Sequence, residues 1–559
     1  MLRIFRIVAG LLIFTLISAY FMDFAGFMPV EFSWLAKIQF VPALKAHLGG
    51  VIAAILLVTF LFGRFYCSAV CPLGVLQDII SWAGRKIKSK SRFEFRKPVP
   101  FLRPVMVIVF LIGFPTVIAS LLDPYSIFGR IACSAFKPIY QCGNNAMVYV
   151  CSLCGVYEIG SWPIFYVNAM VQSLVGCGVA LAFLLLIGIL AYRNGRTYCN
   201  TICPVGTLLG LFSRFSVFRI RIDKQKCISC GLCAAKCKSS CINSKEKTVD
   251  SSRCVDCFDC LGACKKDAIG FSFRQSRSAE ESVKEESAVS SQTEAAVQRE
   301  DVVQTEGGES RRQFVSSLLT IAAISSGSKL SAQEPASSSD VLPPAAPVKS
   351  PTAAASVPSG EDPELFLTGK TPFVRQSPIA PPGALSIAHL NHHCTACHLC
   401  VAKCPAQVLK PAVTEYGPQG FLQPRLEFSR GFCNYDCTVC SDVCPNGALK
   451  KITVEQKHKV QMGRVVFIEE NCVVKVKENS CGACSEHCPT QAVSMVPYKN
   501  GLTIPHINPD ICVGCGGCES ICPVKPFKAI YVEGSPVQND RKEYEEKPQE
   551  EIKLDDFGF

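Results

Sequence analysis

The spacing of the cysteines constrains this chain more than any other feature. The chain has 34 cysteines in 559 residues, and most of them lie in short runs, two or three residues apart. Disulfide-rich secreted proteins are usually much shorter, and the spacings of their cysteines vary. The repeated pattern C-x2-C-x2-C-x3-C is instead typical of bacterial ferredoxins, whose thiolates hold [4Fe–4S] clusters. The spacing therefore predicts an iron–sulfur protein with several cluster-binding domains.

Two such runs follow each other closely in residues 223–272, which we expect to form a two-cluster ferredoxin domain. The fourth cysteine of each run is expected to bind the cluster of the other run. The first predicted cluster has the ligands Cys227, Cys230, Cys233 and Cys264, and the second has Cys254, Cys257, Cys260 and Cys237. Zinc is the alternative metal, since thiolates also bind zinc. Cys241 is expected to be a small buried residue, with replacement of Cys237 as ligand left open.

Four further runs lie in residues 373–533, and two of them have a longer first gap. Because the two irregular runs resemble each other, we expect them to pair with each other and the two regular runs to enclose them. The predicted ligand sets are Cys394, Cys397, Cys400 and Cys522; Cys512, Cys515, Cys518 and Cys404; Cys433, Cys437, Cys440 and Cys488; and Cys472, Cys481, Cys484 and Cys444. Pairing in sequence order is the alternative. Residues 394–398 also match the haem attachment pattern C-x-x-C-H, but Cys400 and Cys404 extend the same stretch into a ferredoxin run.

Residues 1–222 contain four long apolar stretches, at 4–22, 48–62, 101–122 and 164–192. A helix needs about 20 apolar residues to cross a bilayer, so we expect an α-helical membrane domain of four transmembrane helices. Buried core helices of a soluble domain are the alternative. Lys and Arg concentrate in the loops 64–100 and 193–226, which places these loops and the N-terminus in the cytoplasm. The net charge of +11 is thus explained by membrane topology, and no nucleic-acid partner is expected.

An internal repeat relates the two halves of this domain. Residues 63–74 match residues 195–206, and each copy contains a C-x3-C-P motif. We expect two pseudo-repeated halves related by a twofold axis. That axis would bring Cys67, Cys71, Cys199 and Cys203 together, either as an additional thiolate site for a metal or cluster or as four structural thiols.

The remaining segments connect and flank these domains. Residues 273–309 and 333–372 are expected to be disordered linkers, and 534–559 a disordered acidic tail. Between the linkers, residues 310–332 contain an Arg311-Arg312 pair followed by a short apolar run. This segment resembles a twin-arginine export signal, and a chance arginine pair in a linker is the alternative. With that signal, the domain of residues 373–533 would fold α+β around its clusters and then reach the periplasm.

On these motifs the chain resembles a fusion of two known proteins. Residues 1–270 are similar to NapH, the membrane subunit of the quinol-oxidising module that serves periplasmic nitrate reductase, and more distantly to the maturation protein NosR. The shared features are four membrane segments, two C-x3-C-P motifs and a two-cluster ferredoxin. Residues 310–533 resemble NapG, the exported four-cluster partner. Cys237 and Cys264 are followed by Lys where the usual run has Pro.

The resemblance implies a quinol dehydrogenase of the bacterial inner membrane. Menaquinol or ubiquinol would give its electrons through six [4Fe–4S] clusters to a periplasmic reductase or electron carrier. Two other functions remain open: a transmembrane electron wire from a cytoplasmic donor, and a NosR-like maturation factor. Quinol oxidation needs proton acceptors near the membrane, but the sequence singles out no catalytic residue. The carboxylate and imidazole groups considered are His47, Glu31, Asp78, Asp123 and Glu158.

Overall fold

The computed structural model describes nine stretches of the chain, which include all 34 cysteines. They are residues 1–23, 26–87, 93–97, 101–113, 117–154, 158–159, 162–163, 173–273 and 370–542. The twin-arginine segment, both linkers except residues 273 and 370–372, and residues 543–559 lie outside them. The predictions for those segments therefore stay predictions.

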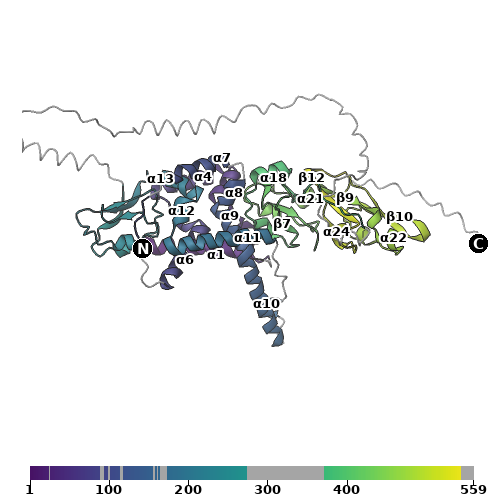
Figure 1. Cartoon of the computed structure of the whole chain (residues 1–559), viewed down its shortest axis with the longest axis horizontal. Coiled ribbons are helices and arrows are strands. Elements are labelled where there is room, and N and C mark those ends of the chain that lie inside the picture. The colour runs from purple at the N-terminus through teal and green to yellow at the C-terminus, as the bar shows by residue number, and fades with distance from the viewer. Residues whose placement is uncertain are drawn as a thin grey trace, which may run out of the picture. The chain divides into compact units, whose positions relative to one another are not determined.

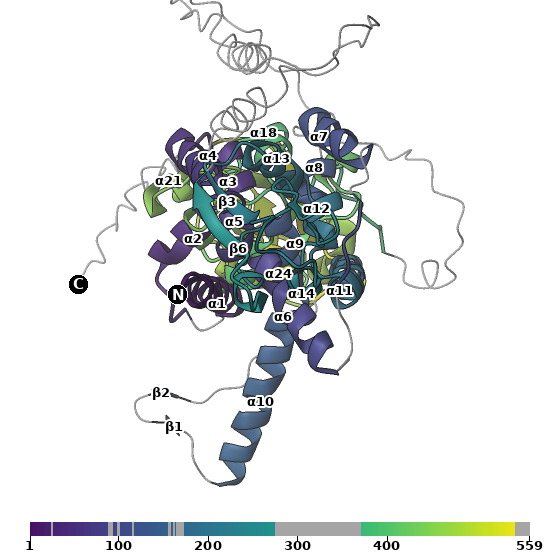
Figure 2. The ribbon, with the colours of Figure 1, turned by 90° about the vertical axis from the view of Figure 1, so that its left-hand side faces the viewer.

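Helices make up the N-terminal part (Figure 1). They are α1 (Leu2–Met22), α2 (Trp34–Lys37), α3 (Phe40–Lys45), α4 (Gly49–Phe62), α5 (Phe65–Ala69), α6 (Pro72–Ile87), α7 (Leu102–Gly113), α8 (Val117–Leu122), α9 (Pro124–Ile131), α10 (Lys137–Leu153), α11 (Leu174–Asn194), α12 (Thr197–Thr201) and α13 (Pro204–Ser213). Helix α6 packs against α1, α9 and α11. Helix α10 projects away from these helices toward the short hairpin of β1 (Glu158–Ile159) and β2 (Trp162–Pro163) (Figure 2).

Two helices, α1 and α11, are long and apolar enough to cross a membrane. The expectation of four spans is therefore not confirmed. The second apolar stretch forms only the 14 residues of α4. The third is divided between α7 and α8, and the described part of each is too short to span a bilayer core of about 30 Å.

The internal repeat has matching local structure in its two copies. Gly63 and Gly195 both end long helices with positive φ, and a five-residue helix carrying the first cysteine follows each of them. The arginine of each copy reaches the other copy: Arg64 Nη2 donates to the Cys199 carbonyl at 2.9 Å, and Arg196 Nη1 donates to the Cys67 carbonyl. These reciprocal bonds, from a buried arginine of each copy to a carbonyl of the other, hold the two halves together.

The first ferredoxin domain is closed by a strand pair at its ends. Strand β3 (Phe218–Ile222) pairs antiparallel with β6 (Ile269–Phe273), and β4 (Ile242–Asn243) pairs with β5 (Thr248–Val249) between them. A short helix, α14 (Leu232–Lys236), follows the second cysteine of the first run. The domain therefore starts at residue 218, a little before the predicted boundary.

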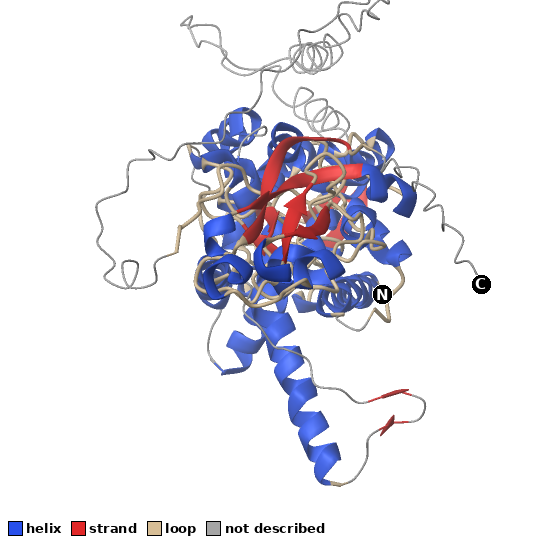
Figure 3. Ribbon diagram, turned by 90° about the vertical axis from the view of Figure 1, so that its right-hand side faces the viewer, coloured by secondary structure: helices blue, strands red, loops and turns tan. Residues whose placement is uncertain are grey.

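The C-terminal domain consists of two halves. Its helices are α18 (Ile387–His393), α19 (Leu399–Lys403), α20 (Val439–Asp442), α21 (Val454–Lys459), α22 (Val473–Lys477), α23 (Ala483–Glu486) and α24 (Gly517–Ile521). Its strand pairs, drawn in red with the others in Figure 3, are β7 (Leu409–Pro411) with β8 (Pro424–Leu426), β9 (Val460–Phe467) with β12 (Ile530–Asp540), and β10 (Val493–Pro497) with β11 (Thr503–Ile507). Residues 534–540 belong to β12, so the prediction that the tail begins at 534 is wrong.

The first half of this domain shares a hydrophobic core with the N-terminal helices. Phe21 of α1, Phe128 of α9 and Val401 of α19 are buried in one cluster. Gly129 lies so close to the Cys397 carbonyl that a Cβ there would come within 2.3 Å of that oxygen. At the edge of this contact, Lys45 Nζ donates to the His392 carbonyl at 2.8 Å. The second half, around residues 465–530, has a core of its own.

The close packing around Gly206, within the second repeat copy, gives a stability prediction. A Cβ at Gly206 would lie 2.2 Å from the Cys199 carbonyl, whereas a Cβ at Gly188 of α11 meets nothing within 4 Å. We expect Gly206→Ala to lower the free energy of unfolding by about 1–3 kcal/mol, as overpacking does. Gly188→Ala is the matched control and should leave it unchanged or slightly higher. Denaturant unfolding in detergent measures both; equal stabilities would contradict the packing described.

Candidate iron–sulfur sites

The four regular cysteine runs share one backbone conformation. In each, the residue two positions after the first cysteine and the residue four positions after it have positive φ. The first of these residues are Ser229, Asp256, Ala396 and Gly514, and the second are Gly231, Phe258, His398 and Gly516. Five of the eight are not glycine, although a left-handed residue with a Cβ costs roughly 1–2 kcal/mol. Such local strain is characteristic of functional loops that surrounding interactions hold in place.

In the first ferredoxin domain the structure groups the cysteines as the spacing predicts. Cys227, Cys230, Cys233 and Cys264 line one cavity. The remaining four predicted ligands lie together on the side that faces the N-terminal helices, where Cys237 interacts with Cys254, Cys257 and Cys260. Cys241 is fully buried beside them, with its sulfur 3.5 Å from Cys237 Sγ. The hydrogen bond between the two sulfurs lowers the pKa of Cys237 and raises that of Cys241.

In the C-terminal domain the nested pairing is wrong, and the cysteines group in sequence order. Cys444 lines a cavity with Cys394, Cys397 and Cys400, the position predicted for Cys522. The other groups are Cys404 with Cys433, Cys437 and Cys440; Cys522 with Cys472, Cys481 and Cys484; and Cys488 with Cys512, Cys515 and Cys518. Each half of the domain has its own core and thus closes its own pair of groups. The longer first gaps of two runs are local insertions and do not determine pairing.

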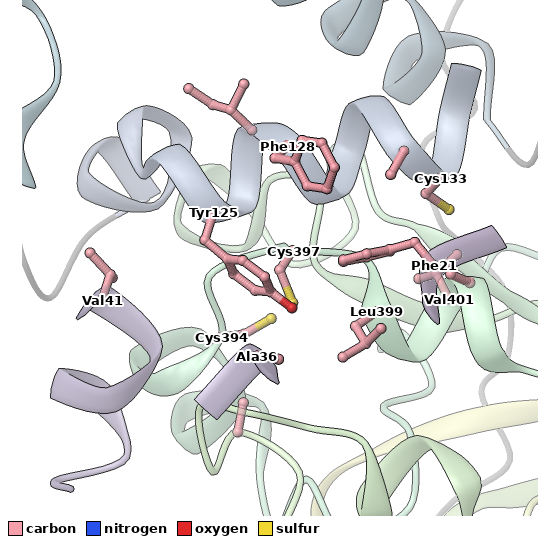
Figure 4. Packing of buried hydrophobic residues seen from close by; sticks show 14 of the residues in the cluster. Phe21, Ala36, Val41, Tyr125, Phe128, Cys133, Cys394, Cys397, Leu399 and Val401 are labelled. Carbon is pink, nitrogen blue, oxygen red and sulfur yellow. The ribbon is translucent and has the colours of Figure 1, made fainter. Parts of the chain in front are cut away.

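These groups form a connected series. The group of Cys394 lies against α9 of the N-terminal part, where Tyr125 points toward Cys394 and Cys397 (Figure 4). The second group shares its half of the domain with the first. The Cys433 amide donates to the Cys515 carbonyl at 2.9 Å, which joins the second group to the group of Cys512. The group of Cys472 shares the core of that second half.

The environment of the sulfurs fits ligands of a cationic iron–sulfur core. Burial raises the pKa of Cys257 and Cys433 to about 11 and that of Cys394 to about 12, so these thiols would be neutral without a metal. Backbone amides donate to Cys394 Sγ at 3.4 Å and to Cys512 Sγ at 3.3 Å. Iron would supply the positive charge that deprotonates the thiols, and the amides would stabilise the thiolates. In the part of the chain described, no three Cys, His, Asp or Glu side chains converge on a single metal ion. Cubanes, with one cysteine on each iron, suit these lined cavities.

The haem pattern at residues 394–398 is not used as a haem site in this arrangement. His398 is buried, and its Nε2 lies 2.9 Å from the Leu422 carbonyl. Cys394 and Cys397 belong to the group that contains Cys400 and Cys444.

The four C-x3-C-P cysteines are brought together, as the repeat predicts. All four are buried in one core. Cys203 lies close enough to Cys199, Cys71 and Cys67 for their charges to raise its pKa. Burial raises the pKa of each of Cys71, Cys199 and Cys203. Gln77 Nε2 donates to Cys199 Sγ at 3.3 Å, and the Gly206 amide donates to Cys203 Sγ at 3.3 Å. These N–H donors would stabilise thiolates, as a bound metal or cluster requires. Both interpretations, a metal or cluster and four structural thiols, stay predictions.

Two of the carboxylates considered as proton acceptors, Asp78 and Asp123, have structural partners. Asp78 accepts from Arg196 Nε at 2.8 Å and also pairs with Arg6 and Lys238. Asp123 caps α9 by accepting from the Ser126 amide at 2.9 Å and its hydroxyl at 2.6 Å. Glu31 lies in the helical turn before α2, and His47 lies beside His393. Glu158 is in β1, and its side chain lies outside the described residues.

Two features of the site were missed from the sequence. Tyr125 Oη is buried and has no hydrogen-bond partner among the described residues. Asp23 forms a buried ion pair with Lys403 at 2.5 Å, between the end of α1 and the run that contains Cys404. Neither lies in a motif, and only the fold brings these distant segments together.

Two family descriptions match the chain. Residues 48–91 and 176–223 match one described as a 4Fe-4S binding domain, and these segments contain the two C-x3-C-P motifs. Residues 479–525 match a 4Fe-4S dicluster domain, which spans most of the third and all of the fourth C-terminal run. The second match agrees with the pairing of those two runs in one half. No solved structure matches.

Curated relatives match about a quarter of the chain. The methylamine utilization ferredoxin-type protein MauM of Methylorubrum extorquens is 31% identical over 152 residues, which are 26% of this chain and 67% of that protein. MauM of Methylobacillus flagellatus is 32% identical over 26% of this chain and 63% of its own length. The ferredoxin-type protein NapG of Escherichia coli is 29% identical over 26% of this chain and 65% of its own. The chain thus spans less than two thirds of the last two proteins.

The observed grouping predicts how iron is lost on mutation. Cys404 and Cys433 belong to one group, so Cys404→Ala, Cys433→Ala and the double variant should each lose the same iron, about four atoms for one cubane. Cys404 and Cys515 belong to different groups, so that double variant, the control, should lose about twice as much. Elemental analysis of anaerobically purified protein measures this. The nested pairing would require the reverse, with the additive loss in the Cys404/Cys433 double variant.

Proposed function

The chain belongs to the ferredoxin-type [4Fe–4S] electron-transfer proteins represented by MauM, and from that premise we propose that it oxidises quinol in the bacterial inner membrane. Electrons would pass through six clusters, two in the cytoplasm and four in the periplasm, to a periplasmic reductase or carrier. The proposal treats the chain as a NapH-like part joined to a NapG-like part. Its twin-arginine segment would export the second part.

The observation that carries the proposal is the placement of cysteine-rich parts at opposite ends of α1. Near its start, Arg3 Nε pairs with Asp259 of the first ferredoxin domain at 2.9 Å. Just after its end, Asp23 pairs with Lys403 of the C-terminal domain. Its 21 residues correspond to about 31 Å of helix, close to the thickness of a bilayer core. This arrangement supports redox centres on both sides of a membrane.

The exposed face of α1 also supports a helix that crosses a membrane. Ile4, Phe5, Val8 and Leu12 are all exposed large apolar side chains on this helix. A row of this kind suits contact with lipid, whereas a soluble protein rarely exposes so continuous an apolar surface. The opposite side of α1 packs against α5 and α6.

A transmembrane electron wire is the second candidate, and the four C-x3-C-P cysteines favour it. They share one core with Cys257 of the first ferredoxin domain and with Cys394 and Cys397 of the C-terminal domain. A cluster held by Cys67, Cys71, Cys199 and Cys203 would join the two cytoplasmic clusters to the periplasmic series. Electrons would then come from a cytoplasmic donor, and quinol would not be needed.

Reduction by quinol separates the two functions. In quinone-depleted membranes containing the whole chain, added menaquinol should bleach the visible absorbance of the oxidised clusters, because quinol is the electron donor. Dithionite added afterwards measures the total reducible absorbance. Reduction by a cytoplasmic-side donor such as reduced ferredoxin, with no response to menaquinol or ubiquinol, would contradict quinol oxidation and favour the wire.

A further inference from the structure

A cavity lies where the end of α1 meets the C-terminal domain. Its volume is about 310 Å³, and its walls come from the loop after α1, the start of α10, the end of α19 and helix α20. Pockets for small organic ligands are commonly about 300–1,000 Å³. The cavity therefore has room for one substituted ring.

One wall of this cavity belongs to a cluster-binding group. Cys404 and Pro405 line it, and the same two residues line the cavity of Cys433, Cys437 and Cys440. A ring held here would be separated from that group only by its own ligand residue. Such contact suits a molecule that exchanges electrons with the cluster, because catalytic geometry depends on close positioning of the reacting groups.

The polar groups of the cavity are few and converge. Asp23, only 9% exposed, pairs with Lys403, whose ammonium also lies 4.1 Å from the centre of the Tyr20 ring. Burial alone would raise the pKa of Asp23, but hydrogen bonds from Lys403 and from the amides of Met28 and Phe27 lower it below its usual value. The carboxylate is thus ionised at neutral pH and can accept a hydrogen bond or a proton from a hydroxyl group.

The cavity adjoins surface that suits lipid. Val30, which lines it, is 37% exposed, and Phe27 and Trp34 on the same segment are 61% and 50% exposed. These side chains lie at the end of α1, one of the two helices long enough to cross a membrane. Apolar surface beside a polar cavity is what a ligand with a polar ring and an apolar tail requires.

We propose that this cavity is the quinol site: the ring binds beside Cys404, and Asp23 accepts a hydrogen bond from a ring hydroxyl. This inference rests on the proposed quinol oxidation. Oxidation of quinol to quinone breaks both O–H bonds and releases two electrons and two protons. The electrons leave singly to oxidised clusters, starting with the group of Cys404. The protons pass one after the other to Asp23 and from there to water.

Two variants of the whole chain test the site in quinone-depleted membranes. Asp23→Asn removes the proton acceptor, and we expect menaquinol-driven cluster reduction to slow by about 100-fold, the lower range for loss of a general base. Val30→Trp fills the cavity with an apolar side chain and should weaken binding of a fluorescent quinol-analogue inhibitor at least tenfold. Asp510→Asn, which breaks an exposed ion pair with Lys542, is the matched control and should behave as wild type.

Dithionite-reducible absorbance and iron content, measured on every variant, report that the clusters are intact. Wild-type rates in Asp23→Asn together with unchanged inhibitor binding in Val30→Trp would overturn the site while leaving quinol oxidation standing. If wild-type protein itself fails to respond to quinol, the proposed function has failed. Inhibitor displaced by quinone-free phospholipid, and not by menaquinone, would identify the cavity as a lipid site and would also overturn the inference.

Discussion

The structure depends on the burial of cysteine sulfur. A buried thiol is neutral, and the raised pKa values of Cys257, Cys394 and Cys433 express the free-energy cost of charging it. Iron reverses that cost, because each thiolate then faces a cation. The helices and strands around the motifs are short, so bound clusters would contribute much of the folding free energy of the ferredoxin domains. The left-handed residues in the regular runs are consistent with loops held in shape by their ligands.

A second constraint is the junction between the N-terminal helices and the first half of the C-terminal domain. Gly129 leaves no space for a side chain beside the Cys397 carbonyl, and Tyr125 lies against the same cluster-binding run. Buried contacts of this kind fix the first group relative to α9. The Asp23–Lys403 pair fixes the second group relative to the end of α1. The proposed quinol site and the proposed electron path both depend on this junction, since both lie where the two parts meet.

The sequence predicted local features well and long-range partners poorly. Spacing was enough to find the cysteine runs and to group the cysteines of the first domain. With only two runs, the fourth cysteine of each run has only one other run whose cluster it can bind. With four runs the choice among pairings depends on which two runs share a half of the domain, and the positions of Cys444 and Cys522 show this only in the fold. The repeat predicted the meeting of Cys67 with Cys199 but not the arginine exchange between copies. Hydropathy predicted four spans, and two helices of the described residues, α1 and α11, are long and apolar enough to cross a membrane.

The central claim is that these cysteines hold redox-active cubanes. Iron, acid-labile sulfide and zinc should be measured on the anaerobically purified whole chain, together with electron paramagnetic resonance spectra after stepwise reduction. The account predicts iron and sulfide in equal amounts, little zinc, and spectra of reduced [4Fe–4S] clusters broadened by magnetic interaction between the neighbouring groups of each pair. Stoichiometric zinc in the cysteine sites, or the absence of any cubane signal after reduction, would contradict it.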